Sequence, residues 1–338
     1  MNGARINWLA LVFCFFLFSA TSKAQLPTKK EKEAALALMA KLINDNYVFP
    51  EKGKKIAASL MQGYKSGIYD SVKTWKAFDS TATKQLQQAS ADGHMYVRYD
   101  PKTVKELAAV KVESKPGEYS EDPFFYGKDA VKNNFGFREV KVLDGNIGYI
   151  KLNEINISEK SLPILASAME FIGNTDALII NLQNNGGGGS AVGNVIQSYF
   201  LPKETPLMEF RMRGGQVNLA KTESWLTAKK YDKPLYILVN RGTFSAAEAL
   251  AYQLQAVKRA VIVGQRSGGG ANMNSWYPVN EHIFISVSTG APTLPGKEEN
   301  WEGKGVQPDY VVEEGKEIEQ VKTLLARTAD EAHKRLVR

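Results

Sequence analysis

The stretch that decides the fold is Pro234-Leu-Tyr-Ile-Leu-Val-Asn-Arg-Gly-Thr-Phe-Ser-Ala-Ala-Glu-Ala-Leu-Ala-Tyr252. Residues 235–239 are apolar and β-prone, Arg241-Gly242 interrupts the run, and residues 246–258 have a helical pattern. This predicts a buried strand that turns directly into a helix, with Ser245 at the turn. Because free N–H groups and the helix dipole at such a turn stabilise negative charge, Ser245 is a candidate nucleophile.

A structural role fits the same residues. Ser245-Ala-Ala-Glu248 is also a capping box, in which serine and glutamate satisfy the first amides of a helix. The window alone does not choose between these two roles.

A second unit of the same kind lies upstream. Strand-like residues 177–182 lead through the glycine run 186–189 into a predicted helix at 191–200. The run fits neither G-x-G-x-x-G nor G-K-[ST], which disfavours a nucleotide site. Such dense glycine still indicates a backbone that approaches a ligand closely. Ser190 nearly matches G-x-S-x-G, but Val192 replaces the last glycine, so it ranks below Ser245.

The order of these units predicts an α/β fold whose glycine loops gather at one end of a sheet. Asp144-Gly145 between two apolar runs predicts a β-hairpin. We expect a signal peptide at residues 1–24, a helical N-terminal domain at 25–95, a connecting loop region at 96–137, and an α/β core with a C-terminal helix at 138–338.

Composition restricts the function further. Arg5, the short apolar run 8–18 and Ser22-Lys23-Ala24 are typical of a cleaved export signal, which predicts a periplasmic or secreted protein without an integral membrane segment. Cys14, the single cysteine, lies in that segment, so a Cys–His zinc site is excluded. The net charge is +7, but the Lys and Arg residues are scattered along the chain and mixed with acidic residues. This distribution disfavours nucleic-acid binding.

A serine nucleophile needs a base, and the chain has three histidines. His333 falls among charged residues of a terminal helix, and His282 begins a strand beside Glu281. His94 follows Asp92-Gly93 at the end of the helical region, where a loop would present it to a cleft.

Four strings together resemble the C-terminal processing (tail-specific) serine proteases. Within that family the chain looks most like the branch of the interphotoreceptor retinoid-binding protein and the tricorn core protease. The strings are Ala177-Leu-Ile-Ile-Asn-Leu-Gln-Asn-Asn-Gly-Gly-Gly188, Thr243-Phe-Ser-Ala-Ala-Glu248, Gly264-Gln-Arg-Ser-Gly-Gly-Gly-Ala271 and Asn300-Trp-Glu-Gly-Lys-Gly-Val-Gln-Pro-Asp309.

The resemblance implies a crotonase-like (ClpP-like) βα core after a small helical domain. It implies Ser245 as nucleophile, His94 as base and Glu302 as the orienting carboxylate. The backbone of Ala246 and of the run Gly186, Gly187 and Gly188 would supply the oxyanion hole.

The chain departs from both branches of the family. The tail-specific branch has a lysine base where this chain has Gly270, and it inserts a PDZ domain for which the stretch from His94 to Glu139 is too short. The tricorn-like branch has a relay serine where this chain has Gly93. Glu302 would therefore reach His94 directly or through a water.

These observations predict an exported serine endopeptidase that cleaves peptides or unfolded C-terminal segments, without metal or cofactor. The alternative is a non-catalytic binder of apolar small molecules or lipids, because the retinoid-binding branch carries such ligands on this fold. A charged Glu302 would raise the pKa of His94 and place the acid limb of activity at or above neutrality. The oligomeric state is left open.

Overall fold

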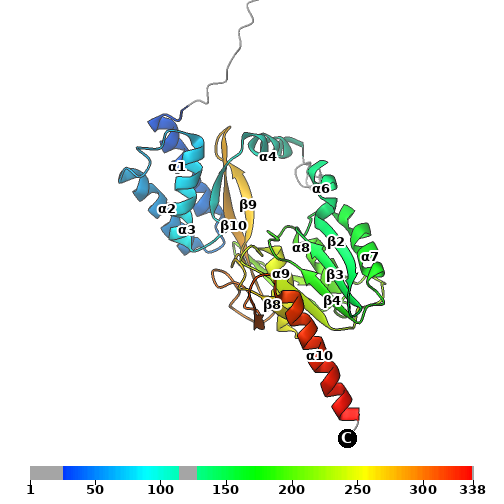
Figure 1. Cartoon of the computed structure of the whole chain (residues 1–338). Coiled ribbons are helices and arrows are strands. Elements are labelled where there is room, and N and C mark those ends of the chain that lie inside the picture. The colour runs from blue at the N-terminus through cyan, green and yellow to red at the C-terminus, as the bar shows by residue number, and fades with distance from the viewer. Residues whose placement is uncertain (1–25, 114–127, 337–338) are drawn as a thin grey trace, which may run out of the picture.

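The computed structural model describes residues 26–113 and 128–336. The predicted signal peptide lies outside these described residues. A helical bundle stands at one end of the molecule and an α/β body at the other, and a long C-terminal helix projects from that body (Figure 1). Among the described residues, none of the helices has the length and apolar composition of a membrane span.

The bundle consists of α1 (Lys29–Asn46), α2 (Pro50–Lys65) and α3 (Trp75–Ser90). Helix α1 begins in a capping box formed by Thr28 and Glu31. The apolar faces of the three helices form one core that also includes Ile283, Ile285 and Val287 of a neighbouring strand. The bundle is therefore packed onto a sheet.

That sheet is antiparallel and was not expected from the sequence. Its order is β1-β10-β5-β6, with β9 also paired to β10. The strands are β1 (Tyr96–Tyr99), β5 (Pro206–Met212), β6 (Val217–Lys221), β9 (Met273–Pro278) and β10 (Ile283–Thr293).

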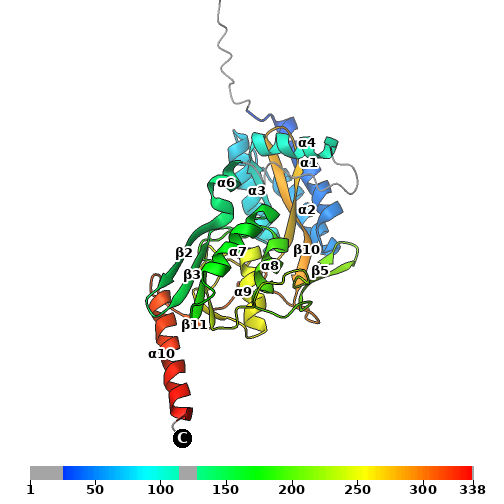
Figure 2. The ribbon, with the colours of Figure 1, turned by 90° about the vertical axis from the view of Figure 1, so that its right-hand side faces the viewer.

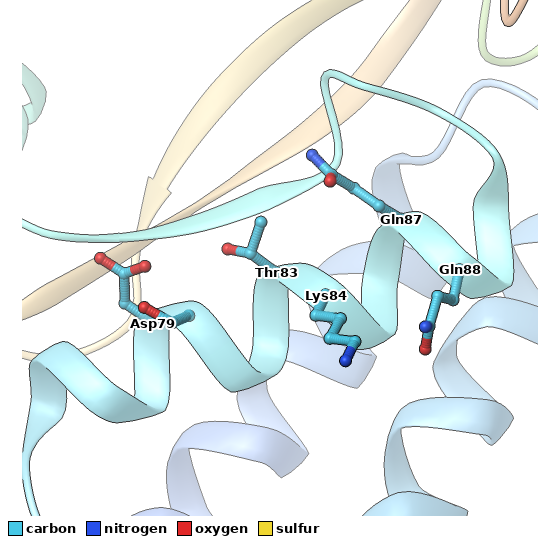
Figure 3. Close-up of a pocket in the computed structure, with 6 residues that line it drawn as sticks. Asp79, Thr83, Lys84, Gln87 and Gln88 are labelled. Carbon is cyan, nitrogen blue, oxygen red and sulfur yellow. The ribbon is translucent and has the colours of Figure 1, made fainter.

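Helix α3 covers the outer edge of β1 (Figure 3). Thr83 Oγ1 donates to Val97 O and accepts from Val97 N, and Asp79 Oδ2 accepts from Tyr99 N at 2.9 Å. Side chains of the helix thus replace a neighbouring strand and close an edge that would otherwise have unpaired backbone groups. They also anchor the loop between α3 and β1, which carries His94.

The second sheet has the order β11-β8-β7-β4-β3-β2 and confirms the predicted α/β core. Strands β3, β4, β7, β8 and β11 are parallel, and β2 pairs antiparallel with β3 across the predicted Asp144-Gly145 turn. The strands are β2 (Phe137–Leu143), β3 (Ile147–Leu152), β4 (Ala177–Asn181), β7 (Leu235–Val239), β8 (Val261–Gly264) and β11 (Tyr310–Val311).

Helices cover both faces of this sheet. Leu178 and Ile180 face the core formed with α7 (Leu162–Phe171), α8 (Ser190–Ser198) and α9 (Ala246–Ala256). Ile179 faces the opposite core, which contains Val321 and Leu324 of α10 (Glu317–Leu336). Beyond these contacts α10 points away from the end that holds the bundle (Figure 2).

The segment 96–137, expected as a connecting region, contains β1 and several helical turns among its described residues. These are α4 (Pro101–Glu113), α6 (Lys128–Lys132) and η1 (Asn134–Gly136); a further turn, η2 (Glu159–Ser161), precedes α7. Pairing of β1 with β10 joins the helical bundle to the rest of the chain.

Candidate active site

Ser245 lies at a sharp turn between β7 and α9. All five residues of β7 are buried, and Thr243 Oγ1 holds the following loop by donating to Leu182 O at 2.8 Å. Ser245 itself has φ 55° and ψ −124°. A non-glycine residue in such a conformation costs on the order of 1–3 kcal/mol, which is typical of functional turns.

His94 approaches Ser245 from the α3–β1 loop. Its Nε2 lies 3.1 Å from Ser245 Oγ, although the two residues are 151 positions apart. Asp92 Oδ1 accepts from the backbone N–H of His94, and the His94 carbonyl accepts from Ser286 Oγ on β10. The imidazole is only 4% exposed, so both its backbone and its ring are held in place.

Glu302 lies on the loop that follows β10, next to the fully buried Trp301. Its Oε2 accepts from the backbone N–H groups of Ala271 and Asn272 at 2.7 and 2.8 Å. Its other oxygen, Oε1, is buried and has no hydrogen-bond partner among the described residues.

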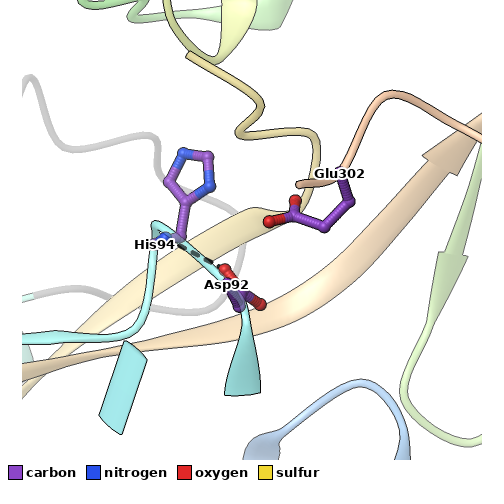
Figure 4. Close-up of side chains that lie close together, drawn as sticks. All are labelled: Asp92, His94 and Glu302. Atoms are coloured by element: carbon purple, nitrogen blue, oxygen red, sulfur yellow. Dashed lines mark hydrogen bonds between the residues drawn. The ribbon is translucent and has the colours of Figure 1, made fainter. Parts of the chain in front are cut away.

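The histidine and the glutamate face one another without a hydrogen bond between them. Figure 4 shows the ring nitrogen next to Cγ of His94, Nδ1, turned toward the Glu302 carboxylate. Within the described part of the chain, Nδ1 also has no partner. Asp92 is the third member of this group, and one ligand atom from each residue lies within 4.8 Å of the others. Among the residues that the structure describes, these three side chains form the group that could hold a cation.

Asp92 was not among the residues expected in the site. It is 1% exposed, and its Oδ2 accepts from Tyr47 Oη and from Asn272 Nδ2. It therefore connects helix α1, the His94 loop and the start of β9. The spacing Asp92-Gly-His94, typical of an Asx turn, was the available signal.

Glu248 was considered only as half of a capping box. Its carboxylate is fully buried and accepts from Ser245 N, Ser267 Oγ, Gly269 N and Gly270 N. The hydrogen bond from the backbone N–H of Ser245 to Glu248 Oε2 forms the glutamate half of the capping box. The same carboxylate also ties the Ser245 turn to the second glycine cluster.

Phe244 fills the space around the imidazole. Its ring centroid lies 4.7 Å from that of His94. A Cβ on Gly270 would lie 2.1 Å from Phe244 Cζ, and one on Gly93 would lie 2.9 Å from it. The resemblance implies a lysine base and a relay serine at these two positions in the two branches, and with Phe244 in this place neither side chain fits without moving the ring.

The glycine run packs directly against the turn. A Cβ on Gly187 would lie 2.6 Å from Ser245 Cβ and 2.9 Å from Ala246 N. The N–H of Gly187 is engaged by Asn185 Oδ1, and that of Gly189 by Ile155 O. In the described chain no hydrogen bond uses the amides of Gly186 or Gly188, which leaves them available to a ligand. As the first residue of α9, Ala246 adds an amide without an intrahelical partner.

The electrostatics of the pair differ from the sequence-based expectation. Burial lowers the pKa of His94, against the opposing effect of the Asp92 charge. Burial and the Asp92 charge raise the pKa of Glu302 to about 7, although two backbone N–H groups oppose this. The pKa of His94 is therefore lowered, not raised as expected, because desolvation of the imidazole dominates.

The other candidates lie elsewhere or outside the description. The ring of His282 packs near Trp75 in the helical bundle, with centroids 5.8 Å apart. The side chains of Ser190 and His333 are not among those that the structure describes.

Comparison with known proteins agrees with this architecture. Residues 146–312 match peptidase family S41, and residues 20–124 match the N-terminal domain of peptidase S41 in eukaryotic IRBP. A carboxyl-terminal-processing protease of Synechocystis sp. is 31% identical over 170 residues, which cover 50% of this chain and 38% of that protein. The chain thus spans well under half the length of this relative.

Solved structures show the same fold at low identity. A lipoprotein from Streptococcus agalactiae has a TM-score of 0.57 at 14% identity, covering 88% of this chain and 96% of that one. The tricorn protease has a TM-score of 0.50 at 14% identity, covering 83% and 34%.

An α/β core behind a helical N-terminal region is thus the architecture of this chain, and it shares its fold with these solved structures. The chain belongs to peptidase family S41.

Proposed function

We propose that this chain is an exported serine endopeptidase with Ser245 as nucleophile, His94 as general base and acid, and Glu302 as the orienting carboxylate. The contact between His94 Nε2 and Ser245 Oγ at a strained turn carries the proposal. A cap alone does not require a buried imidazole at that distance.

The chemistry follows from these contacts. Neutral His94 accepts the Ser245 proton as Oγ attacks a peptide carbonyl, and the imidazolium then protonates the leaving amine. The amide of Ala246 and the amides of Gly186 and Gly188, unengaged within the described residues, stabilise the oxyanion. The amide of Gly187 already donates to Asn185 Oδ1. Water releases the acyl group by the same steps in reverse order. The imidazolium needs an acceptor at Nδ1, and Glu302 Oε1 is the unengaged oxygen on that side.

The substrate class rests on the relatives. We propose polypeptides, with unfolded or C-terminal segments as the preferred form, because the relatives are named for carboxyl-terminal processing. Residues 1–24 have the pattern of an export signal, which supports a periplasmic or secreted site of action. No metal takes part in this scheme.

The test is hydrolysis of a peptide library, read by mass spectrometry. Wild type should cleave, whereas Ser245→Ala and His94→Ala should each lose at least about a hundredfold in kcat/KM. His282→Ala is the matched control and should cleave as wild type does. Equal cleavage by Ser245→Ala and wild type would contradict the proposal.

One observation favours the alternative of an apolar-ligand binder. A cavity of about 490 Å³ lies between α4 and the β9–β10 turn, lined mainly by Pro101, Val104, Ala108, Pro278 and Val279. The apolar-ligand binder becomes the supported function if wild type cleaves no peptide but binds a fluorescent fatty acid, and if Val104→Glu removes that binding.

A further inference from the structure

Two buried polar atoms in the site lack partners and face each other. Nδ1 of His94 and Oε1 of Glu302 make no hydrogen bond within the described residues, and Figure 4 shows the Glu302 carboxylate on the Nδ1 side of the imidazole. His94 is 4% exposed. A buried polar atom without a partner is costly, so the space between these atoms favours a polar occupant.

Asp92 adds a third donor to the same space. One ligand atom from each of Asp92, His94 and Glu302 lies within 4.8 Å of the others. The Asp92 oxygens already accept three hydrogen bonds, yet two carboxylate oxygens have about four lone-pair sites. The cluster therefore offers one nitrogen and two oxygen donors.

We propose that Asp92, His94 and Glu302 form an inhibitory site for a divalent cation, with zinc as the best-fitting ion. Imidazole nitrogen and carboxylate oxygen are zinc ligands, at about 2.0–2.2 Å, and three protein ligands plus water complete a tetrahedron. The three side chains must close by on the order of 1 Å to reach those distances. A cation also offsets the repulsion between two buried carboxylates.

The position of the ion decides its effect. A cation bound at Nδ1 uses the lone pair of that nitrogen, so the single proton of the neutral imidazole resides on Nε2. Nε2 lies 3.1 Å from Ser245 Oγ and then donates to it. No lone pair is left to accept the serine proton. The cation therefore prevents His94 from acting as the base while leaving the fold intact. A catalytic zinc would instead promote the reaction.

Metal binding is measured first, without relying on activity. Ser245→Ala retains all three ligands, and calorimetric titration of the untagged, chelator-treated variant should show zinc binding with one ion per chain. His94→Gln and Glu302→Gln should each weaken it by about tenfold or more. His282→Ala removes the half-buried His282 and its contact with the exposed Glu281, and it should leave the binding unchanged. Circular dichroism verifies that each variant is folded.

Inhibition is measured second, and this part rests on the proposed function. Micromolar zinc should suppress wild-type peptide hydrolysis, and excess chelator should restore it fully. The site is overturned if Ser245→Ala binds no zinc, if His94→Gln binds it equally well, or if zinc bound at this site leaves hydrolysis unaffected. If wild type binds zinc but cleaves no peptide, the proposed metal site stands and the proposed peptidase activity is contradicted.

Discussion

The ring of Phe244 lies where a side chain on Gly93 would have to stand, 2.9 Å from the position of its Cβ. It excludes a side chain at Gly270 even more strongly. Phe244 also lies beside the imidazole of His94. The Phe244 ring therefore leaves no room for a side chain at residue 93 or residue 270 beside the imidazole of His94.

Gly270→Ala should lower the free energy of unfolding by about 1–3 kcal/mol, because Cβ would overlap the Phe244 ring and force it to move. Adding Phe244→Leu should recover part of that loss. Gly193→Ala is the control: it lies in α8 with open space around it and should stabilise by roughly 0.5–1 kcal/mol. Urea unfolding measures all three. Equal stability of Gly270→Ala and wild type would show that the ring is not confined.

Ser245→Gly should be more stable than Ser245→Ala by about 1 kcal/mol, since both lose the hydroxyl but only glycine relieves the positive φ. Both variants should be inactive. Thermal or urea unfolding gives the difference. If alanine is as stable as glycine, the turn stores no strain.

The acid limb of kcat/KM should lie near pH 7 in wild type, measured with a chelator present. Activity needs neutral His94 and ionised Glu302, and the higher of these pKa values, about 7 for Glu302, sets the limb. The two groups titrate as a pair. Glu302→Gln should move the limb to lower pH, because burial lowers the pKa of the remaining His94 imidazole, and should reduce kcat by roughly 10- to 100-fold. An unmoved limb with an intact rate would remove Glu302 from the site.

Stability should also depend on pH through Glu302. Its pKa is about 7 in the folded chain and ordinarily 4.5, so the folded state holds a proton that the unfolded state has released between those values. Stability from this group is complete below pH 4.5 and is lost as pH rises to 7. At pH 8, the free energy of unfolding of Glu302→Gln should therefore exceed that of wild type by on the order of 1–3 kcal/mol. At pH 4.5 the two free energies should differ little. Parallel pH profiles of the two proteins would contradict this.

Local patterns were sufficient for much of this protein. The strand–turn–helix at residues 234–252, the Asp144-Gly145 hairpin and the helices of the bundle follow from contacts among near neighbours in the chain. The location of Ser245 at the start of α9 belongs to this group. The roles of His94 and Glu302 came from resemblance to a family, because spacing alone left three histidines open.

Only the tertiary structure determined the rest. Strands β1, β5, β6 and β9 consist mostly of half-buried or exposed residues. They derive their stability from cross-strand partners such as Tyr96 with Ser286, which a local pattern does not show. Pairing of β1 with β10 positions the preceding loop, which carries Asp92 and His94, and the imidazole of His94 lies against Ser245 and Phe244. The lowered pKa of His94 and the raised pKa of Glu302 arise from burial, a property of the assembled chain and not of either residue's neighbours in sequence.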